Sequence, residues 1–270
     1  MIRQPAVAGS FYPAGAAALR AAVSDCLAVD ARPKTPAPAR AVIVPHAGYQ
    51  YSGRVAGAVY AETSLATSLI ILGPNHTGEG VPVAVMDRGA WRTPLGDAPI
   101  DEPLARRLLE ACGQAELDDR AHRREHSLEV QLPFLQVRME SFAFVPVCVG
   151  TSSLADLSRL GRELAEMLRA WETPVSIVVS SDMSHYLPAG EARRRDMLAV
   201  ERILALDPEG LHRVVREHDI SMCGFAPAVA GLIAARGTGA AEARLVAYAN
   251  SGDAGGGDDR VVGYAGLSVS

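Results

Sequence analysis

The chain has 270 residues, of which 49% are hydrophobic and 21% charged, and its formal net charge is −5 at pH 7. A net negative charge opposes broad electrostatic binding to nucleic acid or to an anionic membrane, because such binding needs a clustered basic surface. The 4 cysteines have no short paired spacing, which fits a reducing compartment, and no apolar run reaches the ~20 residues of a membrane span. We therefore expect one cytoplasmic domain, residues 1–270, without nucleic-acid or membrane partners.

Hydrophobic periodicity and the positions of glycine and proline predict strands that alternate with helices. A non-helical arm over residues 3–13 comes first, and a proline-containing connection over 32–40 follows the first helix. The predicted helices cover residues 14–28, 53–62, 102–112, 127–139, 154–171, 191–206, 208–218 and 226–236. The predicted strands cover residues 42–44, 68–72, 142–149, 175–179, 243–249 and 261–269. An alternating segment, 81–86, leads into a turn-rich stretch, 87–99, that reads as a hairpin lid around Trp91.

This order of elements predicts an α/β fold with three layers, α/β/α, around a central sheet that is mostly parallel or mixed. Three of its strands are each followed by a histidine, namely His46, His76 and His185. Because the carboxyl ends of strands in an open α/β sheet border a ligand-binding crevice, we expect these histidines to face one site. A histidine in a loop is also commonly a structural residue, and spacing alone leaves that alternative open.

Cys223 lies in a turn that precedes a predicted helix. The positive end of a helix dipole lowers the pKa of a thiol, and both imidazole and thiolate bind borderline or soft transition metals. His46, His76 and Cys223 are therefore candidate metal ligands, although an inert buried cysteine is the alternative at Cys223. Burial without reactivity is expected for the other cysteines, which are Cys26, Cys112 and Cys148.

Asp182 and His185 are three positions apart after one strand, so we expect them to meet around a turn. A carboxylate that orients an imidazole raises its basicity and gives a general acid/base near neutral pH. A turn cap at Asp182 is the alternative.

A further group is expected to contact the substrate. His126 and Glu129 have the spacing of one helical face, with helix capping as the alternative. The glycine-rich turn 251–257 matches neither a dinucleotide fingerprint nor a P-loop, and we expect it to line the site. The predicted substrate contacts are His126, Glu129, Tyr49, Ser251 and Asp253. The histidines expected at the surface are His122, His212 and His218.

Several segments of the sequence resemble the motifs of the Memo family, called AmmeMemoRadiSam system protein B in prokaryotes. They cover residues 3–13, 45–49, 73–76, 125–129, 180–186, 223–224 and 251–253, in family order over nearly the whole chain. The resemblance implies a fold similar to that of the class III extradiol ring-cleaving dioxygenases. In those enzymes two histidines and a glutamate hold non-haem iron.

The resemblance also implies roles for single residues. His46 and His76 match the two histidine ligands, and His185 matches the acid/base histidine of the dioxygenases. Cys223 stands where the dioxygenases have the glutamate ligand, and a soft thiolate in place of a hard carboxylate shifts metal preference toward copper or zinc. The prokaryotic family name implies association with an AMMECR1-like protein and a radical SAM protein.

Three functions follow from these residues. The first is a redox or oxygenase-like protein that binds Fe(II) or copper and uses Asp182 and His185 to move protons. The second, which the resemblance to the Memo family implies, is a module without enzymatic activity that binds phosphopeptides or proteins in the same cleft. The third is a zinc-dependent hydrolase, because two histidines, one cysteine and an open position form a known catalytic zinc site.

Overall fold

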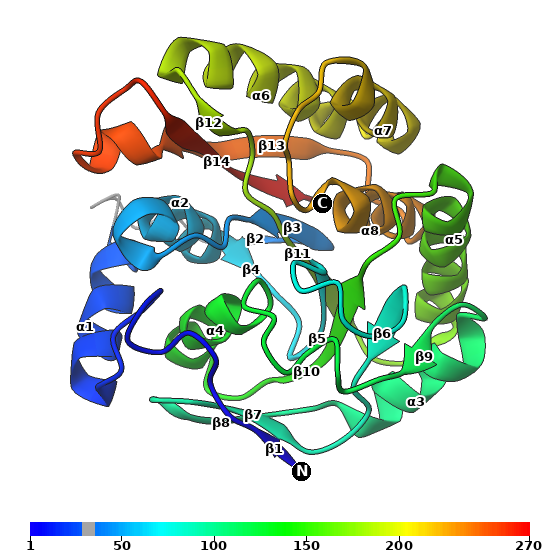
Figure 1. Cartoon of the computed structure of the whole chain (residues 1–270). Helices are drawn as coiled ribbons and strands as arrows, with labels where there is room; N and C mark the ends of the chain where they lie inside the picture. Colours follow the sequence, from blue (N-terminus) through cyan, green and yellow to red (C-terminus); the bar gives the residue numbers. More distant parts are fainter. Residues whose placement is uncertain (29–35) are drawn as a thin grey trace.

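Four apolar strands form the parallel centre of the sheet in the computed structural model, which describes residues 1–28 and 36–270 (Figure 1). In spatial order they are β3 (Ala41–Val44), β11 (Val175–Ser180), β5 (Ser68–Pro74) and β10 (Ala143–Val149). Each is parallel to its neighbour, and nearly all of their side chains are buried. Strands covered on both faces need continuous apolar sequences, which is why these runs were readable as strands.

Antiparallel neighbours on both sides make this nine-stranded sheet mixed, as predicted. β14 (Val261–Val269) runs antiparallel to β3, and β6 (Val83–Val85) runs antiparallel to β10. The other strands of the sheet are β9 (Glu116–Leu117), β12 (His185–Leu187) and β13 (Ala243–Asn250). Two small sheets are formed by β2 (Ala37–Pro38) with β4 (Thr63–Ser64), and by β1 (Ile2–Arg3) with β7 (Ala90–Thr93) and β8 (Gly96–Pro99).

Helices cover both faces of the large sheet, so the three-layer α/β/α architecture is confirmed (Figure 1). One layer contains α1 (Ala16–Leu27), α2 (Tyr49–Glu62) and α4 (Leu132–Arg138). The other contains α3 (Glu102–Ala111), α5 (Leu154–Ala170), α6 (Ala189–Leu204), α7 (Pro208–Glu217) and α8 (Phe225–Gly237). A single buried hydrophobic cluster joins the sheet to both layers. In the part of the chain that the structure describes, no helix has the length and apolar character of a membrane span.

The starts of α2 and α4 differ most from the prediction. α2 starts at Tyr49, before the predicted position 53. The helix predicted over 127–139 begins as a 3₁₀ turn, η1 (Glu129–Gln131), and continues as α4 with Pro133 in its first turn, where a missing N–H breaks no helical hydrogen bond. Residues 32–35 of the predicted connection over 32–40 lie outside the described residues, and the described part, 36–40, contains the short strand β2.

The predicted hairpin around Trp91 forms, and it is fixed to the core. β7 pairs with β8 and also with β1, and the Trp91 ring is 0% exposed against Phe144. The Arg3 guanidinium lies over this ring, 4.3 Å from its centroid. His122 meets the same ring edge-on and is 0% exposed, so the surface prediction for His122 is wrong. The predicted surface histidines that do reach solvent are His212, which is half-buried, and His218, which is exposed.

Candidate metal centre

His46 follows β3, is 2% exposed and is held in one orientation. Its Nδ1 lies 2.9 Å from Oγ of Ser180. That hydroxyl donates its only hydrogen to the carbonyl oxygen of Ser127 at 2.6 Å, and it accepts from the side-chain amide of Gln131 at 2.8 Å. Nδ1 of His46 is therefore the donor to Ser180, which leaves a free lone pair on Nε2.

His76 follows β5, and Glu125 orients its ring. The two carboxylate oxygens accept from Nδ1 of His76 at 2.9 Å and from its backbone N–H at 2.7 Å. Burial alone would raise the pKa of Glu125, but hydrogen bonds from His76 and from the Ser127 amide outweigh it and lower the pKa to about 2. An ionised Glu125 keeps the hydrogen on Nδ1 of His76 and leaves Nε2 free.

Cys223 reaches the same place from the turn before α8. Its sulfur accepts from the backbone N–H of Asp182 at 3.2 Å and lies 3.2 Å from Nε2 of His46. The next residue, Gly224, permits this approach, since a Cβ there would lie 2.3 Å from the carbonyl oxygen of Ser180. Only glycine lets the turn lie so close to the end of β11.

The structure thus brings His46, His76 and Cys223 together, with one donor atom of each within 4.8 Å of the others. In a tetrahedral metal site, bonds of about 2.0–2.3 Å separate the donors by roughly 3.3–3.8 Å. Two imidazole nitrogens with free lone pairs and one sulfur therefore fit a single borderline or soft transition-metal ion. The side chain of His76 is 32% exposed, so solvent reaches the cluster on its side.

Burial disfavours charge on His46 and on Cys223. Burial, and after it the imidazoles of His126 and His76, lower the pKa of His46 well below its ordinary value of 6.5. Burial, and after it Asp182, raise the pKa of the Cys223 thiol, although its place before a helix predicts a lowered one. A bound cation would reverse this preference because it stabilises the thiolate, so metal binding would be coupled to loss of the thiol proton.

The predicted contact between Asp182 and His185 is wrong. The Asp182 carboxylate accepts from the backbone N–H groups of His46 and Ala47, at 2.7 and 3.3 Å, and so caps the turn after β3. Burial raises the pKa of Asp182 to about 6. His185 has its Nδ1 2.9 Å from the carbonyl oxygen of Ser221. Because a carbonyl only accepts, Nδ1 carries the hydrogen and Nε2 of His185 is a proton acceptor.

His126 lies beside the cluster. Its ring stacks on His76 with centroids 4.6 Å apart and meets His46 edge-on at 5.5 Å. Its Nδ1 is 3.6 Å from the Glu125 carboxylate. The predicted contact of His126 with a bound substrate stays a prediction, and the position agrees with it.

Glu129 and Tyr49 are placed differently from the prediction that they contact substrate. Glu129 is 0% exposed, and its carboxylate is paired with Arg3. Tyr49 is 8% exposed and donates its hydroxyl hydrogen to the carbonyl oxygen of Val130 at 2.7 Å. Glu129 accepts hydrogen bonds from the N-terminal arm, a contact between distant segments that a helical spacing of three does not reveal.

Ser251 and Asp253 also use their side chains within the protein. Oγ of Ser251 accepts from the Val262 N–H at 3.0 Å. The Asp253 carboxylate accepts from the Asn250 N–H at 2.8 Å, in the capping box of the 3₁₀ turn η2 (Ser251–Ala254). In this arrangement the two side chains hold the glycine-rich turn, and their contact with a substrate stays a prediction.

Sequence reasoning assigned no role to the residues that orient the ligands, which are Ser180, Gln131 and Glu125. A role for Glu125 was predictable from the sequence, because it immediately precedes the candidate residue His126. The roles of Ser180 and Gln131 were not predictable from the sequence, because their contact joins β11 to η1 and depends on tertiary packing.

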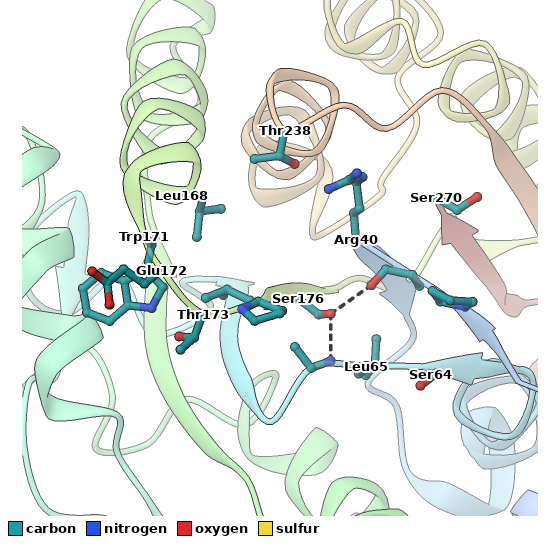
Figure 2. A pocket seen from close by; sticks show the side chains of 15 residues that line it. Arg40, Ser64, Leu65, Leu168, Trp171, Glu172, Thr173, Ser176, Thr238 and Ser270 are labelled. Carbon is teal, nitrogen blue, oxygen red and sulfur yellow. Dashed lines mark hydrogen bonds between the residues drawn. The ribbon is translucent and has the colours of Figure 1, made fainter.

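A large cavity lies at the other end of the parallel strands. It has a volume of about 700 Å³, and Arg40 and Ser176, at the amino ends of β3 and β11, line it (Figure 2). Figure 2 shows Oγ of Ser176 joined to the carbonyl oxygen of Ala39 and to the N–H of Ala66. The candidate ligands follow the carboxyl ends of the strands, so this cavity is separate from them.

Comparison with known sequences gives one consistent result. A family profile described as "Memo-like protein" matches residues 3–268. A MEMO1 family protein of Methanopyrus kandleri is 43% identical over 278 aligned residues, which cover 99% of this chain and 98% of that protein. A MEMO1 family protein of Aquifex aeolicus is 41% identical, with 98% of each chain covered.

Among solved structures, an uncharacterized protein of Escherichia coli K12 has a similar fold, with a TM-score of 0.59. It is 15% identical in sequence, and the match covers 84% of this chain and 98% of that one. At this identity the likeness concerns the fold alone.

Proposed function

The chain belongs to the Memo-like protein family, and we propose that it binds one iron or copper ion through His46, His76 and Cys223 and uses this centre in redox, oxygenase-like chemistry. The observation that carries the proposal is the fixed orientation of both imidazoles. Ser180 holds Nδ1 of His46 and Glu125 holds Nδ1 of His76, so both Nε2 lone pairs are available beside the Cys223 sulfur. Partners of this kind on the second ring nitrogen are typical of histidines that bind metals.

The remaining residues have roles toward a substrate that enters on the His76 side. When bound, the ion supplies Lewis-acid and one-electron redox chemistry. His185 accepts or returns a proton at Nε2, while Ser221 keeps the hydrogen on its Nδ1. Asp182 holds the turn that carries His46 through two backbone N–H groups. His126 stacks on His76 and limits the motion of that more exposed ligand.

A zinc-dependent hydrolase is the second candidate, and the donor set favours it. Two histidines, one cysteine and an open fourth position are a catalytic zinc site in other enzymes. In this case His185 would accept the proton from a water molecule instead of from an organic substrate. The two candidates differ in native metal and in whether oxygen is consumed.

The test is to purify the protein under anaerobic conditions and measure its metal content. Metal-free protein is then titrated with Fe(II), Cu(I) and Zn(II), and oxygen uptake is followed for each form. We expect one equivalent of iron or copper and a metal-dependent uptake of oxygen with a reductant. His46→Gln should lose the metal, while the matched control His218→Gln, at an exposed site, keeps it. Zinc content without oxygen uptake would favour the hydrolase, and no stoichiometric metal would refute the proposal.

A further inference from the structure

Arg3 binds one segment of the chain at three points. Its Nε donates to the carbonyl oxygen of His122 at 3.0 Å, and its Nη2 donates to the carbonyl oxygen of Glu125 at 2.8 Å. Its Nη1 pairs with the carboxylate of Glu129. Arg3 is 7% exposed and lies over the Trp91 ring, so three hydrogen-bonding contacts and this packing hold its guanidinium in place. The residues between these three points form the segment 122–129.

This segment carries the groups that border the candidate metal centre. The backbone of Glu125 is held by Arg3, and the side chain of Glu125 holds His76 through its ring and its N–H. The next residue, His126, stacks on His76. Arg3 is therefore hydrogen-bonded directly to Glu125, the residue that orients the candidate ligand His76.

The arm that carries Arg3 makes further contacts at the same site. Glu129 accepts from the backbone N–H groups of Ala6 and Val7, at 2.8 and 3.1 Å, and from the Tyr12 hydroxyl. Phe11 packs on the His126 ring with centroids 4.7 Å apart. The arm, residues 3–12, thus lies along the whole segment 122–129.

Phe11 also contacts the segment that follows His46. Its carbonyl oxygen accepts from the N–H of Tyr49 at 2.8 Å, at the start of the helix that follows His46. The arm therefore contacts both the residues that touch His76 and the helix that begins three residues after His46.

We propose that Arg3 is a positioning residue for the candidate metal centre, acting through Glu125 on His76; this rests on the metal-binding function proposed above. An arginine suits this role because its planar fork of five N–H donors can satisfy three acceptors in one plane. A lysine keeps the positive charge opposite Glu129, but it has no rigid fork with which to hold the carbonyl oxygen of Glu125. Charge and positioning are therefore separable by substitution.

The experiment compares wild type, Arg3→Lys, Arg3→Gln and Glu125→Gln, each freed of metal and titrated with Co(II). The absorption spectrum at saturating Co(II) reports the geometry around the ion, including the sulfur-to-cobalt band. The matched control is Arg92→Gln, which removes an exposed arginine from β7, the strand next to Arg3. Circular dichroism and thermal unfolding check that each variant is folded.

We expect both Arg3 variants to bind Co(II) about tenfold more weakly, the effect typical of residues that support a ligand, and to shift the spectrum in the same sense as Glu125→Gln. Arg92→Gln should match wild type. If Arg3→Gln does not fold, Arg3→Lys decides alone, since it keeps the charge opposite Glu129. If Arg3→Lys has the affinity and spectrum of wild type while Glu125→Gln binds Co(II) more weakly, the inference is overturned and the proposed function still stands. Absence of Co(II) binding by wild type would overturn both.

Discussion

Nε2 of His46 lies 3.2 Å from the sulfur of Cys223, although the two residues are 177 positions apart in the chain. The contact forms because one residue follows β3 and the other precedes α8, and both reach the carboxyl end of β11. A nitrogen lone pair and a thiol at this distance are a preorganised pair of candidate metal ligands. If they bind an ion, the sulfur would be the feature that decides which metal the site prefers.

Cys223→Glu should weaken Cu(I) binding by more than about 100-fold, beyond the range for residues that only support a ligand. Thiolate competes well for soft Cu(I), whereas two histidines and a carboxylate suit Fe(II), so Fe(II) binding should be retained. Cys223→Ala should weaken both metals. Competition with a chromophoric chelator measures each affinity.

Cys26→Ala is the control for the loss of a thiol, because Cys26 lies on α1 and outside the cluster. It should bind Cu(I) as wild type does. Equal Cu(I) affinity in wild type and Cys223→Glu would show that Cys223 is not a ligand.

Glu125→Gln should lower metal affinity by about 10–100-fold, because His76 loses the partner that keeps its hydrogen on Nδ1. A glutamine offers one acceptor oxygen where the carboxylate now serves His76 and Ser127 with two. Titration calorimetry of metal-free protein measures the change. Glu79→Gln, which removes a carboxylate paired with Arg124 at the surface, should have no effect. An unchanged affinity in Glu125→Gln would mean that the ring of His76 is held by other contacts.

His185→Gln should keep the wild-type metal content while it abolishes turnover or redox cycling. His185 is held by Ser221 and is not among the three donors that converge. Elemental analysis gives the metal content, and oxygen uptake gives the turnover. Loss of the metal from this variant would instead make His185 a ligand.

His122→Leu should flatten the pH dependence of stability between pH 7 and 4.5. Burial, and after it the charge of Arg3, lower the pKa of His122 from 6.5 to about 4. Between these values the unfolded chain takes up a proton that the folded chain does not, so wild-type stability falls as the pH falls. Neither ring nitrogen makes a hydrogen bond of normal geometry within the described residues.

Urea unfolding of metal-free protein measures this effect at both pH values. The loss of stability on acidification should be roughly 2–3 kcal/mol smaller in His122→Leu than in wild type. His218→Gln serves as the control at an exposed histidine. An equal loss of stability on acidification in wild type and in His122→Leu would contradict the prediction.

The sequence was sufficient to predict β3, β5, β10, β11, β13 and β14 and the convergence of His46 and His76, but not the short strands β1, β4, β9 and β12. Continuous apolar runs mark strands that are buried on both faces, and parallel strands place the residues that follow them at one edge. His46 and His76 were predicted from that rule alone. Cys223 lies in a turn with no such rule, and the Memo resemblance supplied its role.

Contacts between polar side chains were less predictable. Three-residue spacing suggested that Asp182 pairs with His185 and that Glu129 lies beside His126. In the structure Asp182 caps the neighbouring strand's turn and Glu129 holds the N-terminal arm. Such partners are chosen by tertiary packing between distant segments, which local spacing does not encode.

The two histidines differ in the partner that holds each Nδ1. His46 donates to a neutral hydroxyl, whereas His76 donates to an ionised carboxylate. A negative partner pushes electron density into the ring, so His76 is the stronger σ-donor of the pair. The two candidate ligands therefore differ in donor strength. His46, in the interior, is the weaker donor, and His76, on the solvent side, is the stronger one. An ion held here would therefore be bound more strongly by His76 than by His46.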